Sequence, residues 1–320
     1  MAKYKVLIAD SRYLTYKYEK QVLEKIDAEI IIETSDDENK IAQAAADVDG
    51  LLVNLAPITA KIISAMTKCK CVSRYGVGYD NVDTKALKAK GIFLANVPDY
   101  CGQDVSDHAF ALFMDCVRKV SRKDRLIRQG RWNLTGIQNV YRIAGKTFGF
   151  VGYGMIARCL HRKLSGFNIG RFLISDPYVS ADTAAGAGAE LVELDTLCTQ
   201  ADYISIHAPL LPATKGLISR RQLALMKNTA IIINTSRGPL IDQDALIDAL
   251  KHGKIACAGL DVFENEPLEA ESELRKLDNV TLTDHAGWYS EESIVELKTK
   301  AAQNIADTLI KGRPAYAVEL

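Results

Sequence analysis

Short apolar segments alternate along the chain with longer amphipathic ones. The first series of apolar segments comprises 4–10 (YKVLIAD), 28–34 (AEIIIET), 50–56 (GLLVNLA), 70–76 (KCVSRYG) and 91–97 (GIFLANV). Helix-like stretches lie between them, such as 16–26 and 38–48. Apolar runs rich in Val and Ile, separated by helical patterns, predict βαβ units and a parallel sheet covered on both faces.

A second series follows in the middle of the chain. It comprises 146–152 (KTFGFVG), 171–176 (RFLISD), 202–208 (DYISIHA), 230–236 (AIIINTS), 256–262 (ACAGLDV) and 279–285 (NVTLTDH). Two such series predict an α/β protein with two doubly wound parallel-sheet domains. A long helical pattern from Cys101 joins the series, and a last one over 291–312 follows the final strand. We therefore expect an inserted arrangement, with one domain formed by 1–99 and 286–320 and the other by 100–285.

Composition narrows the class of protein. Hydrophobic residues make up 48% and charged residues 25% of the 320 positions, as in soluble globular proteins. The formal charge is zero, so a nucleic-acid partner is not indicated. No apolar run approaches the roughly 20 residues that span a bilayer. The seven cysteines show no CxxC pair and no zinc spacing, which predicts free thiols in a cytoplasmic protein and no metal site.

The segment 146–164 combines a strand, a glycine turn and a helix. Gly152 and Gly154 begin the pattern G-x-G-x-x-[G/A], and Ala157 holds its third place. The glycines permit a tight turn and close approach of a pyrophosphate, and N–H groups at the helix start bind phosphate. The next strand ends in Asp176, near the spacing expected for the acidic residue that binds an adenosine ribose. Because a carboxylate repels a 2′-phosphate, the pattern favours NAD over NADP.

The chain resembles the NAD-dependent D-2-hydroxyacid dehydrogenases over almost its whole length. The motifs that carry the resemblance are RYGVGYDNVD (74–83), NVPDYCGQDVSDHA (96–109), the glycine turn, ADYISIHAPL (201–210), INTSRGPLID (233–242), GLDVFENEP (259–267) and TDHAGWYS (283–290). The last is closest to the C-terminal-binding corepressor branch of the family and its bacterial relatives. The resemblance implies a Rossmann-type cofactor domain inserted in a flavodoxin-like substrate domain.

The resemblance also implies three catalytic residues. His285 matches the acid/base, Glu266 the acid paired with it, and Arg237 the arginine that binds the substrate carboxylate. Hydride transfer to a 2-keto carbon leaves charge on oxygen, so a proton donor is needed. A neighbouring carboxylate favours the charged imidazolium, and a guanidinium fork suits a carboxylate. Taken alone, a lone histidine is more often structural than catalytic, and the family match decides in favour of catalysis.

Further residues are expected at the cofactor and the substrate. The expected cofactor contacts are Gly152, Tyr153, Gly154, Met155, Ile156, Asp176, His207, Thr235 and Asp261. The expected substrate contacts are Tyr75, Val77, Gly78, Arg237, His285 and Trp288. For Asp261 the alternative is a strand-end aspartate, and for Trp288 it is packing. His207 is expected to border the cofactor chiefly through its backbone.

Two classes of function remain open at the level of sequence. The first is an enzyme that interconverts a 2-keto acid and a D-2-hydroxy acid with NAD. The second is a corepressor-like protein that binds NAD(H) with little turnover, because the corepressors keep the same three residues. The helix from Cys101 and the basic arm ending at Arg131 and Trp132 look like the dimer-forming segment of the family, so we expect a homodimer.

Overall fold

The computed structural model describes residues 2–10, 12–132 and 139–320. The chain divides into two compact units. The terminal unit consists of Met1–Cys101 and Ser290–Leu320, and the central unit of Gly102–Tyr289. These divisions lie two and four residues beyond the expected boundaries at 99 and 285. The second difference arises because residues up to 287 are hydrogen-bonded to Asp261 of the central unit.

The terminal unit is built on a parallel five-stranded sheet in the order β2-β1-β3-β4-β5. Its strands are β1 (Tyr4–Ala9), β2 (Ala28–Glu33), β3 (Gly50–Val53), β4 (Cys71–Arg74) and β5 (Phe93–Ala95). Its helices are α1 (Lys17–Leu23), η1 (Glu24–Ile26), α2 (Glu38–Ala45), α3 (Ala60–Ala65), α4 (Thr84–Lys90) and α12 (Glu291–Lys311). This strand order is that of flavodoxin-like folds.

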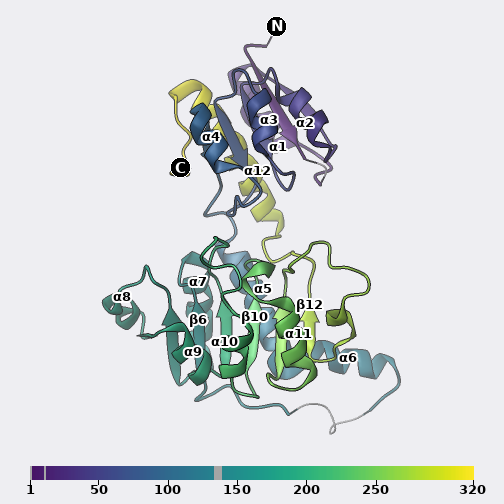
Figure 1. Cartoon of the computed structure of the whole chain (residues 1–320), viewed down its shortest axis with the longest axis vertical. Coiled ribbons are helices and arrows are strands. Elements are labelled where there is room, and N and C mark those ends of the chain that lie inside the picture. Colours follow the sequence, from purple (N-terminus) through teal and green to yellow (C-terminus); the bar gives the residue numbers. More distant parts are fainter. Residues whose placement is uncertain (1, 11, 133–138) are drawn as a thin grey trace. The chain divides into compact units, whose positions relative to one another are not determined.

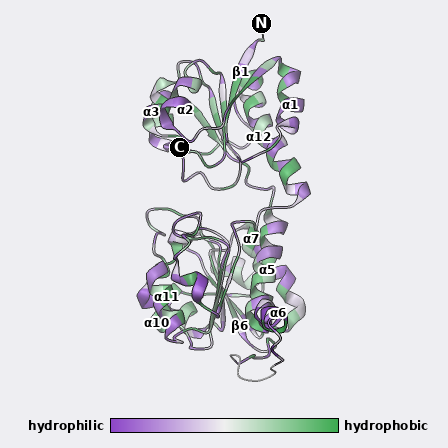
Figure 2. Cartoon of the chain, turned by 90° about the vertical axis from the view of Figure 1, so that its right-hand side faces the viewer, coloured by the Kyte–Doolittle hydropathy of each residue, from purple (hydrophilic) through white to green (hydrophobic). Residues whose placement is uncertain are grey.

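Two layers of helices enclose this sheet. Helices α2 and α3 cover one face, and α1 and α12 cover the other (Figures 1 and 2). All four residues of β3 are buried, as expected of a strand covered on both faces. A capping residue begins α2: Asp37 accepts hydrogen bonds from the N–H groups of Asn39 and Lys40, which satisfies two otherwise unpaired donors.

Helix α12 completes the core of the terminal unit. It begins at a capping box formed by Ser290 and Ser293, and Ile305 packs where Gly50 of β3 leaves room. The Ser73 hydroxyl donates to the carbonyl oxygen of Ala301 at 3.0 Å. Lys298 pairs with Glu19 of α1 at 3.4 Å, with both side chains almost fully buried. The first five strands therefore depend on the last helix for one covered face.

The central unit is built on a parallel seven-stranded sheet in the order β12-β11-β10-β9-β6-β7-β8. Its strands are β6 (Thr147–Val151), β7 (Arg171–Ser175), β8 (Glu190–Leu191), β9 (Tyr203–Ile206), β10 (Ile231–Asn234), β11 (Cys257–Leu260) and β12 (Val280–Leu282). The order reverses between β6 and β9, as in Rossmann folds. Both units thus confirm the predicted pair of parallel-sheet α/β domains.

Helices enclose the central sheet on both faces. They are α5 (Gly102–Arg118), α6 (Val120–Arg128), α7 (Met155–Leu164), η2 (Ser165–Phe167), α8 (Ala181–Gly186), α9 (Leu194–Gln200), α10 (Arg220–Leu225), η3 (Gly238–Leu240), α11 (Gln243–Lys251) and η4 (Glu273–Lys276). Helices α10 and α11 lie on one face and α5 and α7 on the other (Figures 1 and 2). Every residue of β9, β10 and β11 is buried.

No helix among the described residues is long and apolar enough to cross a membrane.

Candidate active site

A histidine and a carboxylate meet where two neighbouring strands end. Glu266 follows β11, and His285 follows β12. Nδ1 of His285 lies 2.6 Å from Oε2 of Glu266, and Oε1 of Glu266 accepts the N–H of Phe263 at 3.0 Å. Nε2, on the other side of the imidazole, has no hydrogen-bond partner among the described residues. The geometry fits a proton-transferring imidazole oriented by a carboxylate.

The charge of Glu266 is fixed by its surroundings. Burial raises the pKa of this carboxyl group, but the hydrogen bond and charge of His285, the N–H of Phe263 and the charge of Arg237 together outweigh burial. The pKa of Glu266 is therefore lowered from its ordinary 4.5. The carboxylate is ionised near neutral pH and supplies a negative partner to the ring.

Arg237 is held near this pair by close backbone packing. It follows β10 and caps η3. The next residue, Gly238, lies so close to Phe263 that an added Cβ would be 1.9 Å from the Phe263 carbonyl carbon. The segment of Arg237 is thus pressed against the segment that leads to Glu266, which explains the charge effect on that carboxylate. All three residues expected to be catalytic are brought to the carboxyl edge of the central sheet.

The glycine turn joins β6 to α7 at the point where strand order reverses. Gly152 has a φ of +83°, and an added Cβ there would lie 2.7 Å from the backbone nitrogen of Ala208. Only glycine fits such a position. Gly154, the N-cap of α7, has nothing within 4 Å of an added Cβ. Met155 and Ile156 open the helix, so their N–H groups belong to its first turn.

Asp176 lies across this turn, one residue after β7. Its Oδ2 accepts the N–H of Tyr153 at 2.8 Å, and its Oδ1 accepts the N–H of Tyr178 at 2.8 Å. The side chain of Tyr153 turns the other way, since its hydroxyl lies 2.6 Å from Nδ1 of His161. Any contact of Tyr153 with a cofactor in this arrangement would come from its backbone.

Two buried polar atoms beside the turn have no partner among the described residues. They are Nδ1 of His207, after β9, and Oγ1 of Thr235, after β10. Burial lowers the pKa of His207 to about 3, so its ring is neutral. Buried polar atoms are rarely left unpaired. The open space at Gly154 and these two unpaired atoms are consistent with a dinucleotide bound in the crevice between β6 and β9, where they would meet it.

Asp261 and Trp288 also belong to the central unit. Asp261 is 1% exposed, and both of its carboxylate oxygens accept N–H groups of the loop that carries His285. Trp288 is half-buried and meets Tyr289 edge-on, with ring centroids 5.9 Å apart. His108, on α5, lies beside Asp261: its Nε2 is 2.9 Å from Oγ1 of Thr283 and 3.2 Å from Oδ1 of Asp261.

Three residues expected at the substrate lie in the terminal unit, just after β4. The Tyr75 side chain is 1% exposed and donates to Glu19 at 2.9 Å, so it belongs to the core of that unit. Val77 is 37% exposed, and its carbonyl oxygen accepts the side-chain amide of Asn96. Gly78 follows in the same loop, which begins at the carboxyl end of its strand, where parallel α/β sheets bind ligands.

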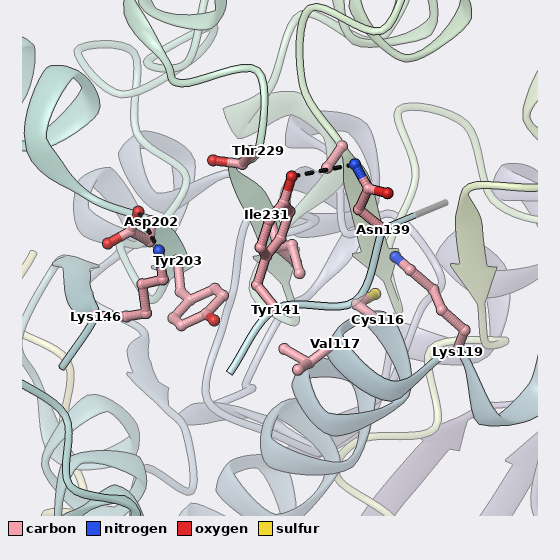
Figure 3. A pocket seen from close by; sticks show the side chains of 11 residues that line it. Cys116, Val117, Lys119, Asn139, Tyr141, Lys146, Asp202, Tyr203, Thr229 and Ile231 are labelled. Atoms are coloured by element: carbon pink, nitrogen blue, oxygen red, sulfur yellow. Dashed lines mark hydrogen bonds and ion pairs between the residues drawn. The ribbon is translucent and has the colours of Figure 1, made fainter. Parts of the chain in front are cut away.

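A partly open hollow lies elsewhere in the central unit (Figure 3). Its lining includes Lys146, Tyr203, Ile231 and Ala256, which stand at the amino ends of β6, β9, β10 and β11. His285 and Glu266 follow the carboxyl ends of their strands. The hollow is therefore not the acid–base site.

The central unit has the strand order of dinucleotide-binding domains and a histidine–carboxylate pair at its carboxyl edge. These features define the class of the protein as an NAD-binding oxidoreductase. The family model for the D-isomer specific 2-hydroxyacid dehydrogenase NAD-binding domain matches residues 110–287. The chain belongs to the D-isomer specific 2-hydroxyacid dehydrogenase family.

Individual relatives agree with this assignment. A glyoxylate reductase of Korarchaeum cryptofilum is 39% identical over 274 residues, which cover 84% of this chain and 81% of that protein. A D-3-phosphoglycerate dehydrogenase of Methanocaldococcus jannaschii is 35% identical over 90% of this chain, but the chain spans only 55% of that relative. The crystal structure of an NADPH-dependent glyoxylate/hydroxypyruvate reductase from Sinorhizobium meliloti, in complex with NADP and malonate, matches with a TM-score of 0.88 and 26% identity, covering 99% and 97% of the two chains.

The expected family, cofactor and class of activity are thereby confirmed. The chain is an NAD-dependent 2-hydroxyacid dehydrogenase or reductase.

Proposed function

We propose that the chain reduces an unphosphorylated 2-keto acid to a D-2-hydroxy acid, with His285 as the proton donor. The observation that supports this most directly is the 2.6 Å contact between Nδ1 of His285 and Glu266. It leaves Nε2 of the imidazolium to protonate the carbonyl oxygen. NADH, when bound, supplies the hydride that adds to C2. In the reverse direction neutral His285 accepts the proton of the hydroxyl group.

Arg237 is proposed to bind the substrate carboxylate. Its guanidinium presents paired N–H donors, which suit the two carboxylate oxygens. In this arrangement the residue binds the ground state and the transition state alike. The N–H groups of Val77 and Gly78 are proposed as further donors to the carboxylate. The proposed wall of the substrate pocket is Trp288, whose apolar ring suits an unphosphorylated side chain on the keto acid.

The test is a panel of 2-keto acids, phosphorylated and unphosphorylated, with loss of NADH absorbance as the readout. We expect turnover of an unphosphorylated acid. The variant His285→Ala should lower kcat by roughly 10²–10⁴ in both directions, as for other general acid–base groups. No turnover of any acid by the wild-type protein would favour the corepressor-like NAD-binding alternative. Near-normal kcat in the variant would show that the histidine is structural.

We propose that NAD(H) is preferred over NADP(H). Asp176 lies beside the glycine turn, and its carboxylate oxygens accept the backbone N–H groups of Tyr153 and Tyr178. A 2′-phosphate there would face a like charge. Steady-state kinetics with both cofactors measure the preference. An equal or better kcat/KM with NADPH would remove Asp176 from the ribose site, and the NADP-bound relative makes this a real alternative.

A homodimer and a cytoplasmic location are also proposed. The dimer is supported by α6, which has no buried residues and carries the exposed apolar side chains of Val120 and Ile127. Trp132, in the arm after it, is 85% exposed. A cytoplasmic location is supported by the seven buried cysteines, each of which is a free thiol.

A further inference from the structure

The loop that carries His285 is held by a single aspartate. The N–H of His285 donates to the backbone carbonyl of Asp261 at 2.8 Å. The N–H groups of Ala286 and Gly287 donate to its Oδ1 and Oδ2 at 3.0 and 2.9 Å. Successive N–H groups that converge on an anion form a concave nest. Here the anion is a buried side chain of the same unit.

The backbone at His285 needs this support. Its φ of +59° lies in the left-handed region, which a residue with a side chain rarely adopts. Such a conformation persists where the surroundings impose it. The three N–H contacts with Asp261 impose it here, so the direction of the imidazole depends on where Asp261 lies.

His108, on helix α5, completes the surroundings of Asp261. Oγ1 of Thr283 donates to Oδ1 of Asp261 at 2.6 Å. Burial raises the pKa of Asp261, but hydrogen bonds from His108, Thr283 and Gly287 outweigh it, so the pKa is lowered and the carboxylate only accepts. The single hydroxyl hydrogen of Thr283 is therefore donated to Asp261 and cannot be donated to His108. Nε2 of His108, 2.9 Å from the same hydroxyl, must therefore carry a hydrogen and donate.

Gly287 packs closely against both Asp261 and His108. An added Cβ there would lie 2.9 Å from Oδ2 of Asp261 and 3.4 Å from Cδ2 of His108. The loop backbone thus rests directly on the aspartate and on the histidine ring. A change in the position of His108 would be passed to the loop through both contacts.

We propose that His108 is a positioning residue for the acid–base histidine. From α5, Nε2 of His108 donates to Thr283 and Asp261. These two residues hold the loop that carries His285 and so set the direction of its imidazole ring. The ring of His108 takes no part in proton transfer. This inference rests on the proposed role of His285. It also gives Asp261 a structural function: its buried carboxylate shapes the loop by accepting the N–H groups of Ala286 and Gly287.

The test compares two substitutions at one position. His108→Leu keeps the bulk and removes the donor, whereas His108→Gln keeps an N–H donor on a side chain of similar length. We expect His108→Leu to lower kcat at least tenfold in both directions, because small misplacements of a catalytic group are costly. The dissociation constant for NADH should stay within twofold. His108→Gln should recover most of kcat. His252→Leu, at an exposed histidine on the end of α11, is the matched control and should behave as wild type.

A second readout does not need turnover. Hydrogen exchange of the peptide 283–289 should be faster in His108→Leu than in the wild type, and His108→Gln should restore protection. Thr283→Val removes the hydroxyl without altering α5, and it should reproduce both effects even where His108→Leu fails to fold.

Two results would overturn the proposal. One is unchanged kcat together with unchanged exchange in folded His108→Leu. The other is a loss of NADH affinity equal to the loss of kcat, which would place the network at the cofactor instead. If the wild type turns over no keto acid, the proposed function fails by itself, and the exchange data still decide whether His108 positions the loop.

Discussion

At the scale of single residues, His285 and Glu266 form a pair whose response to pH follows from its charges. The pKa of Glu266 is lowered because His285, Phe263 and Arg237 outweigh the effect of burial. A carboxylate with a folded pKa below its unfolded value stabilises the protein fully above about pH 4.5, and this contribution is lost as the pH falls through the lowered value. Glu266 is therefore ionised throughout the neutral range.

Glu266→Gln should move the pH dependence of catalysis. Reduction requires charged His285, and the substitution removes the negative charge that favours it. We expect the falling limb of the reduction rate to move to lower pH, and oxidation to become active at lower pH. The measurement is the pH–rate profile in both directions. The unfolding free energies of variant and wild type should also converge at acid pH.

A limb that stays in place would show that the carboxylate does not act on the ring. Asp284→Asn is a suitable control, because Asp284 precedes His285 in an exposed position, and among the described residues no hydrogen bond or ion pair links its side chain to His285 or Glu266.

At the scale of elements, the two glycines of the turn between β6 and α7 have different structural roles. Gly152 is required by its φ of +83° and by the backbone of Ala208, 2.7 Å from an added Cβ. Gly154 has neither restraint, and its surroundings are open. The first glycine therefore serves the fold, and the second leaves space over the start of the helix.

Alanine substitutions should separate these roles. Gly152→Ala should lower the unfolding free energy by about 1–3 kcal/mol or more, since it adds backbone strain and a clash. Gly154→Ala should leave the melting temperature almost unchanged but weaken NADH binding about tenfold or more, because its methyl group would occupy the space for the pyrophosphate. Thermal melts and NADH fluorescence titrations measure both effects. Wild-type NADH affinity in folded Gly154→Ala would place the pyrophosphate elsewhere.

Elements with a strong local pattern could be predicted from the sequence. The β-branched runs that became β9 and β10 are buried on both faces, and such strands read as continuous apolar segments. Strand β8 was not predicted, because Glu190–Leu191 is too short to show a pattern. The break between α5 and α6 was also missed. Lys119 adopts a φ of +60° there, and nothing in its residue type signals this.

At the scale of the whole molecule, contacts between distant positions limited what the sequence could show. His108 and Thr283 are 175 positions apart, and Tyr75 and Glu19 are 56 apart. Periodicity reports which face of an element is apolar, but not which polar side chains meet across elements. The roles expected of His285, Glu266 and Arg237 came from the family motifs, and the structure adds the 2.6 Å contact between His285 and Glu266.

The chain should form a dimer in solution. Light scattering at micromolar concentration should give twice the chain mass of 35.2 kDa. Ile127→Glu should weaken the dimer, because it places a charge on the exposed apolar face of α6. Ile310→Glu is the matched control, since Ile310 is 55% exposed and Ile127 is 51% exposed. A wild-type mass of one chain would refute the prediction.

The split composition of the terminal unit has a consequence for how the protein is made. Its first segment ends at Cys101, yet helix α12, which covers one face of its sheet, lies within Ser290–Leu320. A ribosome adding about 5–20 residues per second needs roughly 10–45 s to travel from one to the other. The central unit, Gly102–Tyr289, is synthesised in that interval. Until α12 is synthesised, the face of the first strands that α1 and α12 cover is only partly covered, and such exposed apolar surface is what chaperones bind.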